Sequence, residues 1–200
     1  MHHLICPVCS SSLKPNDSDK SLSCVNAHLF DVAKQGYVNL LLSQHKKSKN
    51  PGDTSEMVSA RTLFLNQGFY QGIAESFESV VLENSTFDNP SLENDDINRL
   101  IDYSHCDLAC GEGYYTSRLN KLLREKIEGA QPSKLGLSVI RSSGIDISTP
   151  AIKAACRRSR NIQWLVASTA RIPLGNNTQD LVSGLFFHFD LQEISRILKP

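Results

Sequence analysis

Four residues near the N-terminus have the types and the spacing of a metal site. Cys6 and Cys9 are separated by two residues, Cys24 and His28 by three, and the polar residues 10–23 lie between the pairs. Two ligands in a tight turn can share one ion, and three thiolates with one imidazole complete a tetrahedron around Zn²⁺. Because four protein ligands leave no open position, the spacing predicts a structural zinc ion. The alternative is that these cysteines are incidental or buried.

A second stretch, CGEGYYT at residues 110–116, has the glycine spacing of a loop that binds a nucleotide-like cofactor. Gly111 and Gly113 lie between a predicted strand that ends near Asp107 and a predicted helix. Glycines let a ligand approach the backbone closely, and the first helical turn offers free N–H groups. Asp146 ends the next predicted strand, where a carboxylate can accept the ribose hydroxyls of an adenosine-type cofactor. The alternative is an ordinary tight strand-to-helix turn.

The elements that must position this loop are strands alternating with helices from residue 99 onward, which indicates an α/β domain. Upstream, Asp53 and Glu56 are typical of a capping box that opens a helix. That helix is expected to end at Gly68, and a second one is expected over residues 70–82. The apolar face of the first helix is predicted to carry Met57, Ala60 and Phe64.

The densest positive run of the chain lies between the cysteine cluster and these helices. It consists of His45, Lys46, Lys47 and Lys49. Two interpretations stay open for it, contact with nucleic-acid phosphates and a solvated surface, because the run has no interleaved aromatic residues.

Composition limits the class of protein. The 200 residues are 40% hydrophobic and 21% charged, with a formal net charge of zero. Such a chain can bury one sizeable core and a small satellite module, and it would meet a nucleic acid through a local patch. No apolar run approaches a membrane span and MHHLICP lacks a secretory apolar region, so we expect a cytoplasmic protein without a membrane partner. Reducing conditions there favour metal binding over disulfides.

We expect three parts along the chain. Residues 1–35 form a zinc-binding module, residues 36–98 a helical linker, and residues 99–200 a cofactor-binding α/β domain. The acidic, turn-rich residues 84–98 mark the last boundary.

Between residue 6 and about residue 174, the chain resembles the bacterial 23S rRNA guanine-N1 methyltransferases, S-adenosylmethionine enzymes with an N-terminal zinc module. The linker stretches are specific to that family. The shared stretches are CPVC, AHLFDVAKQGYVNLL, QHKKSKNPGD, EMVSAR, CGEGYYT, GIDIS, AIKAA and VAS. The resemblance implies a Rossmann-like class I methyltransferase sheet with an N-terminal zinc-binding module, and methyl transfer to N1 of a guanine in a 23S rRNA hairpin.

The resemblance also implies roles for individual residues. It makes the four clustered residues the zinc ligands and assigns Asp146 to the cofactor ribose. Asp107, Gly111 and Gly113 are assigned to the methionine end of the cofactor, and Ala167 and Ser168 to its adenine. The zinc module and the basic run would grip the rRNA, and a homodimer is compatible with this arrangement. No proton acceptor is assigned.

Three departures from the family pattern leave alternatives open. The first is Ala109, which replaces the first glycine of the motif, and the second is the connection between the first two strands, which residues 129–143 lengthen. In the third, His188 replaces a proline, and the LKP stretch that ends at Pro200 leads in this family into the last strands. We therefore expect a C-terminally truncated sheet. The alternatives are a catalytically inactive remnant that binds RNA or S-adenosylmethionine, and a small-molecule methyltransferase with an incidental zinc module.

Overall fold

The computed structural model describes residues 2–16, 20–46, 48–84, 102–129 and 139–200. Lys47 and all but the first residue of the predicted boundary at 84–98 lie outside these ranges. The division of the chain into three parts stays a prediction.

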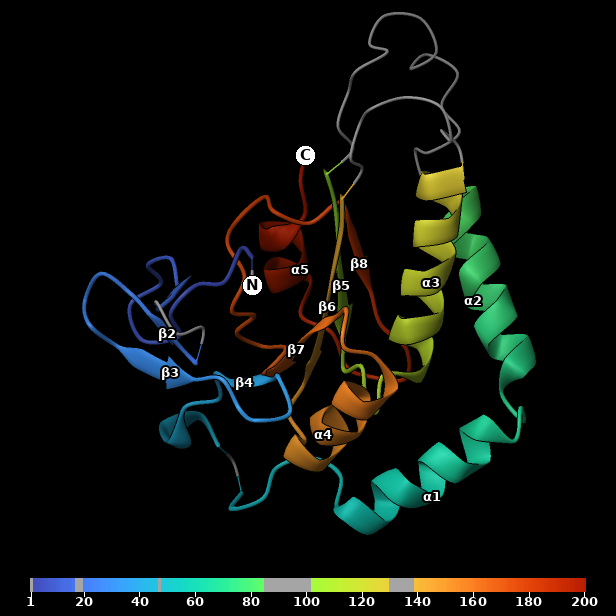
Figure 1. The fold of residues 1–200 in the computed structure, drawn as a ribbon, viewed down its shortest axis with the longest axis horizontal. Coiled ribbons are helices and arrows are strands. Elements are labelled where there is room, and N and C mark those ends of the chain that lie inside the picture. The colour runs from blue at the N-terminus through green and yellow to red at the C-terminus, as the bar shows by residue number, and fades with distance from the viewer. Residues whose placement is uncertain (1, 17–19, 47, 85–101, 130–138) are drawn as a thin grey trace, which may run out of the picture.

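Two sheets make up the strand framework (Figure 1). The small N-terminal sheet is antiparallel and contains β1 (Lys14–Pro15), β2 (Ser21–Ser23) and β3 (Leu29–Asp31) in that order. The larger sheet is parallel throughout, with the order β4-β7-β6-β5-β8. Its strands are β4 (Val38–Asn39), β5 (Asp102–Leu108), β6 (Val139–Asp146), β7 (Gln163–Val166) and β8 (Leu181–Ser183).

Helices cover both faces of the parallel sheet (Figure 1). On one face lie α3 (Tyr114–Gly129) and α4 (Thr149–Arg158), with α1 (Ser55–Asn66) packed on α4 and α2 (Gln71–Glu83) packed on α3. The short α5 (Leu191–Ile197) lies on the other face, and a 3-10 turn spans Ser43–His45. The predicted strand ends near Asp107 and at Asp146, and the predicted helix over residues 70–82, are confirmed.

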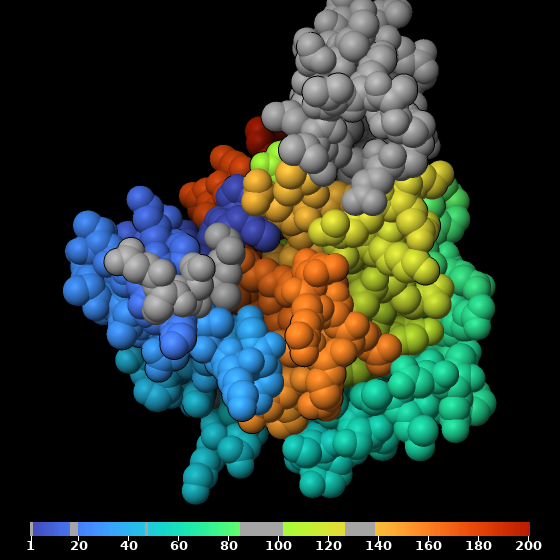
Figure 2. Space-filling view, in the orientation of Figure 1, coloured from blue at the N-terminus to red at the C-terminus, as the bar shows by residue number. Residues whose placement is uncertain are grey.

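The N-terminal module and the parallel sheet share one hydrophobic core. Leu4 and Leu22 from the N-terminal module pack in the same buried cluster as Leu108, Leu165 and Ile197. Figure 2 shows the N-terminal module, in blue, directly against the body of the protein. The edge strand β4 strengthens this connection, because Val38 pairs with Leu165 of β7. The N-terminal module is therefore held by buried contacts and not by a flexible tether.

The start and the buried face of α1 differ from the prediction. Thr54, not Asp53, caps the helix, and its hydroxyl accepts a hydrogen bond from the Met57 amide at 3.4 Å. The residues that α1 buries are Val58 and Leu65. All three residues of the predicted face, Met57, Ala60 and Phe64, are exposed. The physical reason is the surface against which the helix packs. Ala151 and Ala154 surround Val58, and Ala74 and Tyr114 surround Leu65.

Gly144 in the middle of β6 makes the sheet sensitive to an added methyl group. A Cβ there would lie closer than 3.0 Å to the buried ring of Trp164. We expect Gly144→Ala to lower the free energy of unfolding by about 1–3 kcal/mol, because overpacking forces the ring to move. Urea denaturation measures this change.

Gly72→Ala in α2 is the matched control. Its Cβ would meet no atom within 4 Å, so it should raise the free energy of unfolding by about 0.5–1 kcal/mol. Equal stability of the Gly144→Ala variant and the unsubstituted protein would contradict the packing argument.

Candidate functional site

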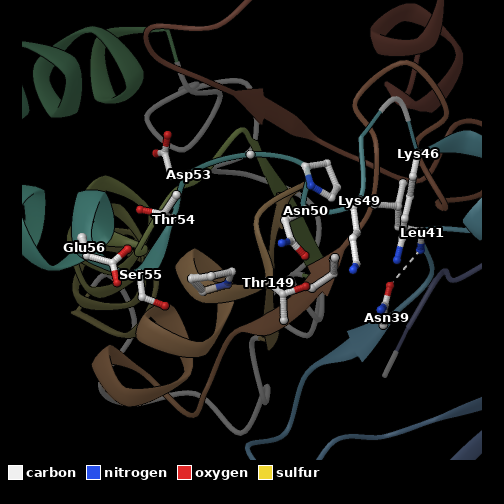
Figure 3. Close-up of a pocket in the computed structure, with 14 residues that line it drawn as sticks. Asn39, Leu41, Lys46, Lys49, Asn50, Asp53, Thr54, Ser55, Glu56 and Thr149 are labelled. Carbon is white, nitrogen blue, oxygen red and sulfur yellow. Dashed lines mark hydrogen bonds between the residues drawn. The ribbon is translucent and has the colours of Figure 1, made fainter.

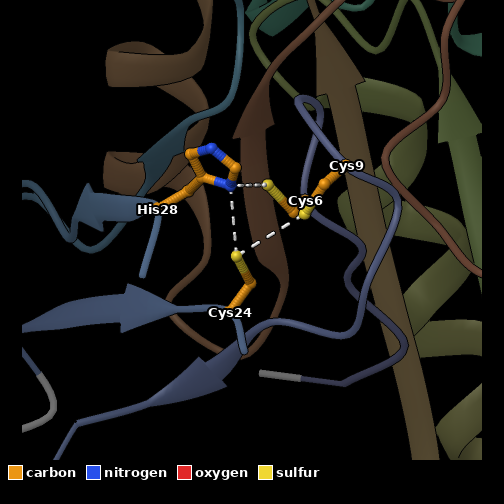
Figure 4. Close-up of side chains that lie close together, drawn as sticks. All are labelled: Cys6, Cys9, Cys24 and His28. Atoms are coloured by element: carbon orange, nitrogen blue, oxygen red, sulfur yellow. Dashed lines mark hydrogen bonds between the residues drawn. The ribbon is translucent and has the colours of Figure 1, made fainter. Parts of the chain in front are cut away.

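The four predicted zinc ligands lie together (Figure 4). Their ligand atoms are all within 4.8 Å of one another. Cys24 Sγ lies 3.3 Å from His28 Nδ1 and 3.6 Å from Cys9 Sγ, and Cys6 Sγ lies 3.6 Å from His28 Nδ1. Ligands at Zn–S and Zn–N bond lengths of about 2.3 and 2.1 Å in a tetrahedron lie roughly 3.5–3.8 Å apart. The donor set and its spacing therefore fit a closed zinc site.

Two tight turns direct these ligands inward. The Ser10 amide donates to the Cys6 carbonyl at 2.8 Å, and the Ala27 amide donates to the Cys24 carbonyl at 2.9 Å. The Val8 amide also donates to Cys6 Sγ at 3.4 Å. Ser11 Oγ lies 2.8 Å from Cys9 Sγ and holds the pKa of that thiol down to about 5. Cys9 is therefore in the thiolate form that binds metal at neutral pH.

A second candidate site lies at the carboxyl end of the parallel strands, where ligands bind in open α/β sheets. It is a cavity of about 220 Å³. The predicted residues Asp107, Gly111 and Asp146 line it, together with Ala109 and Phe186. The end of β5 and the loop after it carry Asp107 and Gly111, and the end of β6 brings Asp146 to them from 35 positions beyond Gly111 in the chain.

The Asp146 carboxylate is fixed by backbone amides. One oxygen accepts a hydrogen bond from the Gly111 amide at 2.9 Å, and the other accepts one from the Ser148 amide at 2.7 Å. Burial raises the pKa of Asp146 above its ordinary value. These two bonds orient the carboxylate at the glycine-rich loop.

Asp107 is turned into the sheet and is only 4% exposed. Its carboxylate accepts hydrogen bonds from Thr116 Oγ1 and, at 2.7 Å, from Ser183 Oγ on the neighbouring strand β8. Burial raises the pKa of Asp107. Because Ser183 donates its only proton to Asp107, it accepts from His105 Nε2 at 2.8 Å. The buried His105 is neutral at pH 7, since burial lowers its pKa to about 4.

The other predicted cofactor residues do not line this cavity. Gly113 lets the loop pack closely against strand β7, because a Cβ there would lie 2.6 Å from Trp164 Cη2. Ala167 is buried, and its amide donates to the Asp146 carbonyl at 3.0 Å. Ser168 lines a separate cavity of about 590 Å³ between the zinc module and the segment after β7.

Ala109, which replaces the first glycine of the motif, has a left-handed backbone with φ of 54°. This conformation favours glycine, so the alanine is strained by about 1 kcal/mol or more. The Cys110 amide in this loop nevertheless donates a hydrogen bond to the Ile145 carbonyl at 3.0 Å. The substitution is accommodated without loss of the turn.

Sequence reasoning missed three charged residues of the cavity. Arg61 of α1 donates from Nε to Glu112 Oε2 at 2.8 Å and from Nη1 to Asp53 Oδ2. The cavity wall therefore comes partly from the linker. The EMVSAR stretch contains Arg61, but nothing in its local pattern indicates that it reaches the glycine-rich loop.

Part of the basic run lines a neighbouring cavity of about 300 Å³ (Figure 3). Lys46 and Lys49 stand on the side of Asn39, and Asp53 and Glu56 on the side of α1. Asp53 lines both cavities, so the segment of the linker at Asp53 lies between them. In the part of the chain that the structure describes, no helix is both long and apolar enough to cross a membrane.

Comparisons with known families and folds agree with these two sites. Residues 4–49 match the RlmA N-terminal zinc-ribbon family, and residues 106–200 match a methyltransferase domain family. A solved Methanococcus maripaludis protein, described provisionally as an S-adenosyl-L-methionine-dependent methyltransferase, is 17% identical with a TM-score of 0.52, over 77% of this chain and 64% of its own. The fold is that of a class I methyltransferase with an N-terminal zinc ribbon, which confirms the predicted fold class.

Similarity along nearly all of this chain narrows the class of methyltransferase. The chain is 30% identical, over 100% of its length, to the 23S rRNA (guanine(748)-N(1))-methyltransferase of Streptomyces fradiae. It is 29% identical, over 97% of its length, to YxjB of Bacillus subtilis, which is assigned provisionally as a 23S rRNA guanine-N1 methyltransferase. These matches confirm the predicted resemblance to the 23S rRNA guanine-N1 methyltransferases. The chain spans 61% and 60% of these two relatives.

The metal site generates the next prediction. We expect Cys24→Ser to release the zinc ion, because three remaining ligands open the tetrahedron to water. Metal analysis of the purified protein and the visible spectrum after cobalt substitution measure the loss. Cys156→Ser, at a buried cysteine of α4, is the control and should keep one zinc per chain. Stoichiometric zinc in the Cys24→Ser variant would contradict the assignment.

Proposed function

We propose that the protein is an S-adenosylmethionine-dependent methyltransferase that acts on N1 of a guanine in a 23S rRNA hairpin. The observation that carries the cofactor part is the charge of the 220 Å³ cavity. Four carboxylates line it, those of Asp53, Asp107, Glu112 and Asp146. S-adenosylmethionine brings a sulfonium and an ammonium, whereas a dinucleotide would bring a pyrophosphate that these carboxylates repel. The cavity therefore favours the cationic cofactor.

Each predicted cofactor residue has a place in this proposal. Asp146, oriented by the amides of Gly111 and Ser148, accepts the ribose hydroxyls. Gly111 has no side chain, so the methionine end of the cofactor can approach its backbone closely. Asp107 stabilises the wall of the cavity through its hydrogen bonds with Thr116 and Ser183. Gly113 acts by letting the loop pack closely against Trp164 of β7. Ala167 and Ser168 follow β7, where the adenine is expected.

The bound cofactor would supply an electrophilic methyl group at its sulfonium. The chain's contribution is to orient this cofactor and to hold the guanine in line with it, because correct placement lowers the barrier to methyl transfer. Two aromatic residues that line the cavity, Tyr115 and Phe186, offer apolar surface to a base. Their ring centroids lie 6.4 Å apart.

The rRNA part of the proposal rests on the relatives, on the zinc ribbon and on the lysines of the basic run. Both relatives named above are assigned to 23S rRNA, and the zinc ribbon matches the RlmA family. Lys46 and Lys49 offer a local positive patch in a chain with zero formal net charge. The four clustered residues would hold zinc as a structural ion. A cytoplasmic location follows from this substrate, and a homodimer stays a prediction.

The inactive remnant that the sequence left open is not favoured. The turn at Ala109 is intact, and the carboxylate of Asp146 stands oriented at the glycine-rich loop. The relatives are assigned to the methyl-transfer activity, which further supports an enzyme.

The proposed function predicts the behaviour of an Asp146→Asn variant. We expect its dissociation constant for S-adenosylmethionine to rise about 10- to 100-fold, because the ribose hydroxyls lose a charged acceptor. Calorimetry measures the binding, and transfer of labelled methyl to an unmodified 23S rRNA hairpin measures the reaction.

Asp102→Asn is the control for this experiment. Asp102 pairs with Arg141 at the opposite end of β5, so neither binding nor transfer should change. Reverse transcription that stops at one guanine would place the methyl on its pairing edge. The proposed function is wrong if the protein neither binds S-adenosylmethionine nor labels the hairpin.

The basic run gives a second prediction. We expect the double variant Lys46→Gln, Lys49→Gln to bind the hairpin more weakly and with a shallower salt dependence. Each lost phosphate contact lowers the log–log slope by about 0.7–0.9. The control is Lys121→Gln, Lys126→Gln in α3, at two exposed lysines that do not line the 300 Å³ cavity, and it should keep the slope. Equal slopes for all three proteins would assign the run to the solvated surface.

A further inference from the structure

Arg61 is the one cation among the described residues that line the 220 Å³ cavity. It comes from α1 of the linker and reaches the glycine-rich loop, where the other charged groups are the four carboxylates. A Cβ on Gly111 would lie 3.3 Å from Arg61 Nη2, so the guanidinium lies directly against the bare backbone of the loop.

Two of the three guanidinium nitrogens are already bound. Nε donates to Glu112, whose side chain is 3% exposed, and Nη1 donates to Asp53. Nη2 donates to none of the residues that the structure describes, and it is the nitrogen beside Gly111. The guanidinium plane is therefore fixed by two anions, with one edge left for a third.

The negative charge of the cavity means that the carboxylate of the cofactor needs a cation beside it. The methionine part of S-adenosylmethionine carries an α-carboxylate besides its ammonium and sulfonium. In a cavity lined by four carboxylates, this fifth carboxylate is repelled unless a cation faces it. Asp53 and Glu112 raise the pKa of Arg61 despite its partial burial, so Arg61 is charged at every working pH.

We propose that Arg61 binds the α-carboxylate of the cofactor through Nη2, and that the linker helix α1 thereby forms part of the cofactor site. This inference rests on the proposed function. It makes Arg61 a binding residue for the cofactor, whereas a purely structural role would only join α1 to the loop at Glu112.

The test compares two ligands that differ only in this carboxylate. Calorimetry measures the binding of S-adenosylmethionine and of its decarboxylated analogue to the full chain and to Arg61→Gln. We expect Arg61→Gln to weaken the binding of S-adenosylmethionine about 10- to 100-fold. The affinity for the decarboxylated analogue should stay or rise, because the variant cavity is more acidic and this ligand has no anion.

Arg118→Gln is the matched control. Arg118 pairs with Glu78 at 2.7 and 3.0 Å, joins α2 to α3 and does not line the cavity. Both ligands should bind this variant as they bind the unsubstituted protein. Thermal unfolding of both variants reports any loss of structure.

The outcomes separate this inference from the proposed function. An equal loss of affinity for both ligands in Arg61→Gln would mean a structural role and would overturn the inference alone. Unchanged binding of S-adenosylmethionine by Arg61→Gln would do the same. Failure of the unsubstituted protein to bind S-adenosylmethionine would overturn both proposals.

Discussion

Three parts of the molecule meet at the hydrogen bonds of Ser148. Its hydroxyl donates to the Asp53 carbonyl at 2.7 Å and accepts from the Ala151 amide at 3.2 Å, and its own amide donates to Asp146 at 2.7 Å. One residue thus caps α4, orients a carboxylate of the cavity and holds the linker. Gly52 allows this closeness, because a Cβ there would lie 2.7 Å from Ser148 Cβ. The cavity therefore has its shape only while the linker is docked.

Features fixed by short-range constraints could be predicted from the sequence. The zinc cluster is set by two turns, each of which joins ligands at most four residues apart, so spacing alone indicates it. The strand that ends at Asp146 follows from strand–helix alternation, and the glycine-rich turn follows from its own composition. The helix over Gln71–Glu83 has a buried face with helical periodicity, carried by Ala74 and Val81.

Features decided by distant partners could not be predicted. Asp53 and Thr54 are both good helix caps. Thr54 is the residue that caps α1, whereas the Asp53 side chain pairs with Arg61. The apolar residues of α1 are compatible with more than one face, and the receiving surface of α4 selects Val58. The Glu112 side chain accepts a hydrogen bond from Arg61, which lies 51 positions away in the sequence. The two-residue strand β4 forms only because it pairs with β7.

The charge distribution explains how a chain with zero formal net charge can serve two oppositely charged ligands. Carboxylates surround the glycine-rich loop, whereas the described lysines of the basic run line the neighbouring 300 Å³ cavity on the side of Asn39. Under the proposed function, the cofactor enters with one net positive charge, and its product leaves with none because the sulfonium has become a thioether. An acidic cavity holds the cation more tightly than the neutral product. The same carboxylates that select the cofactor would therefore favour release of the product after methyl transfer.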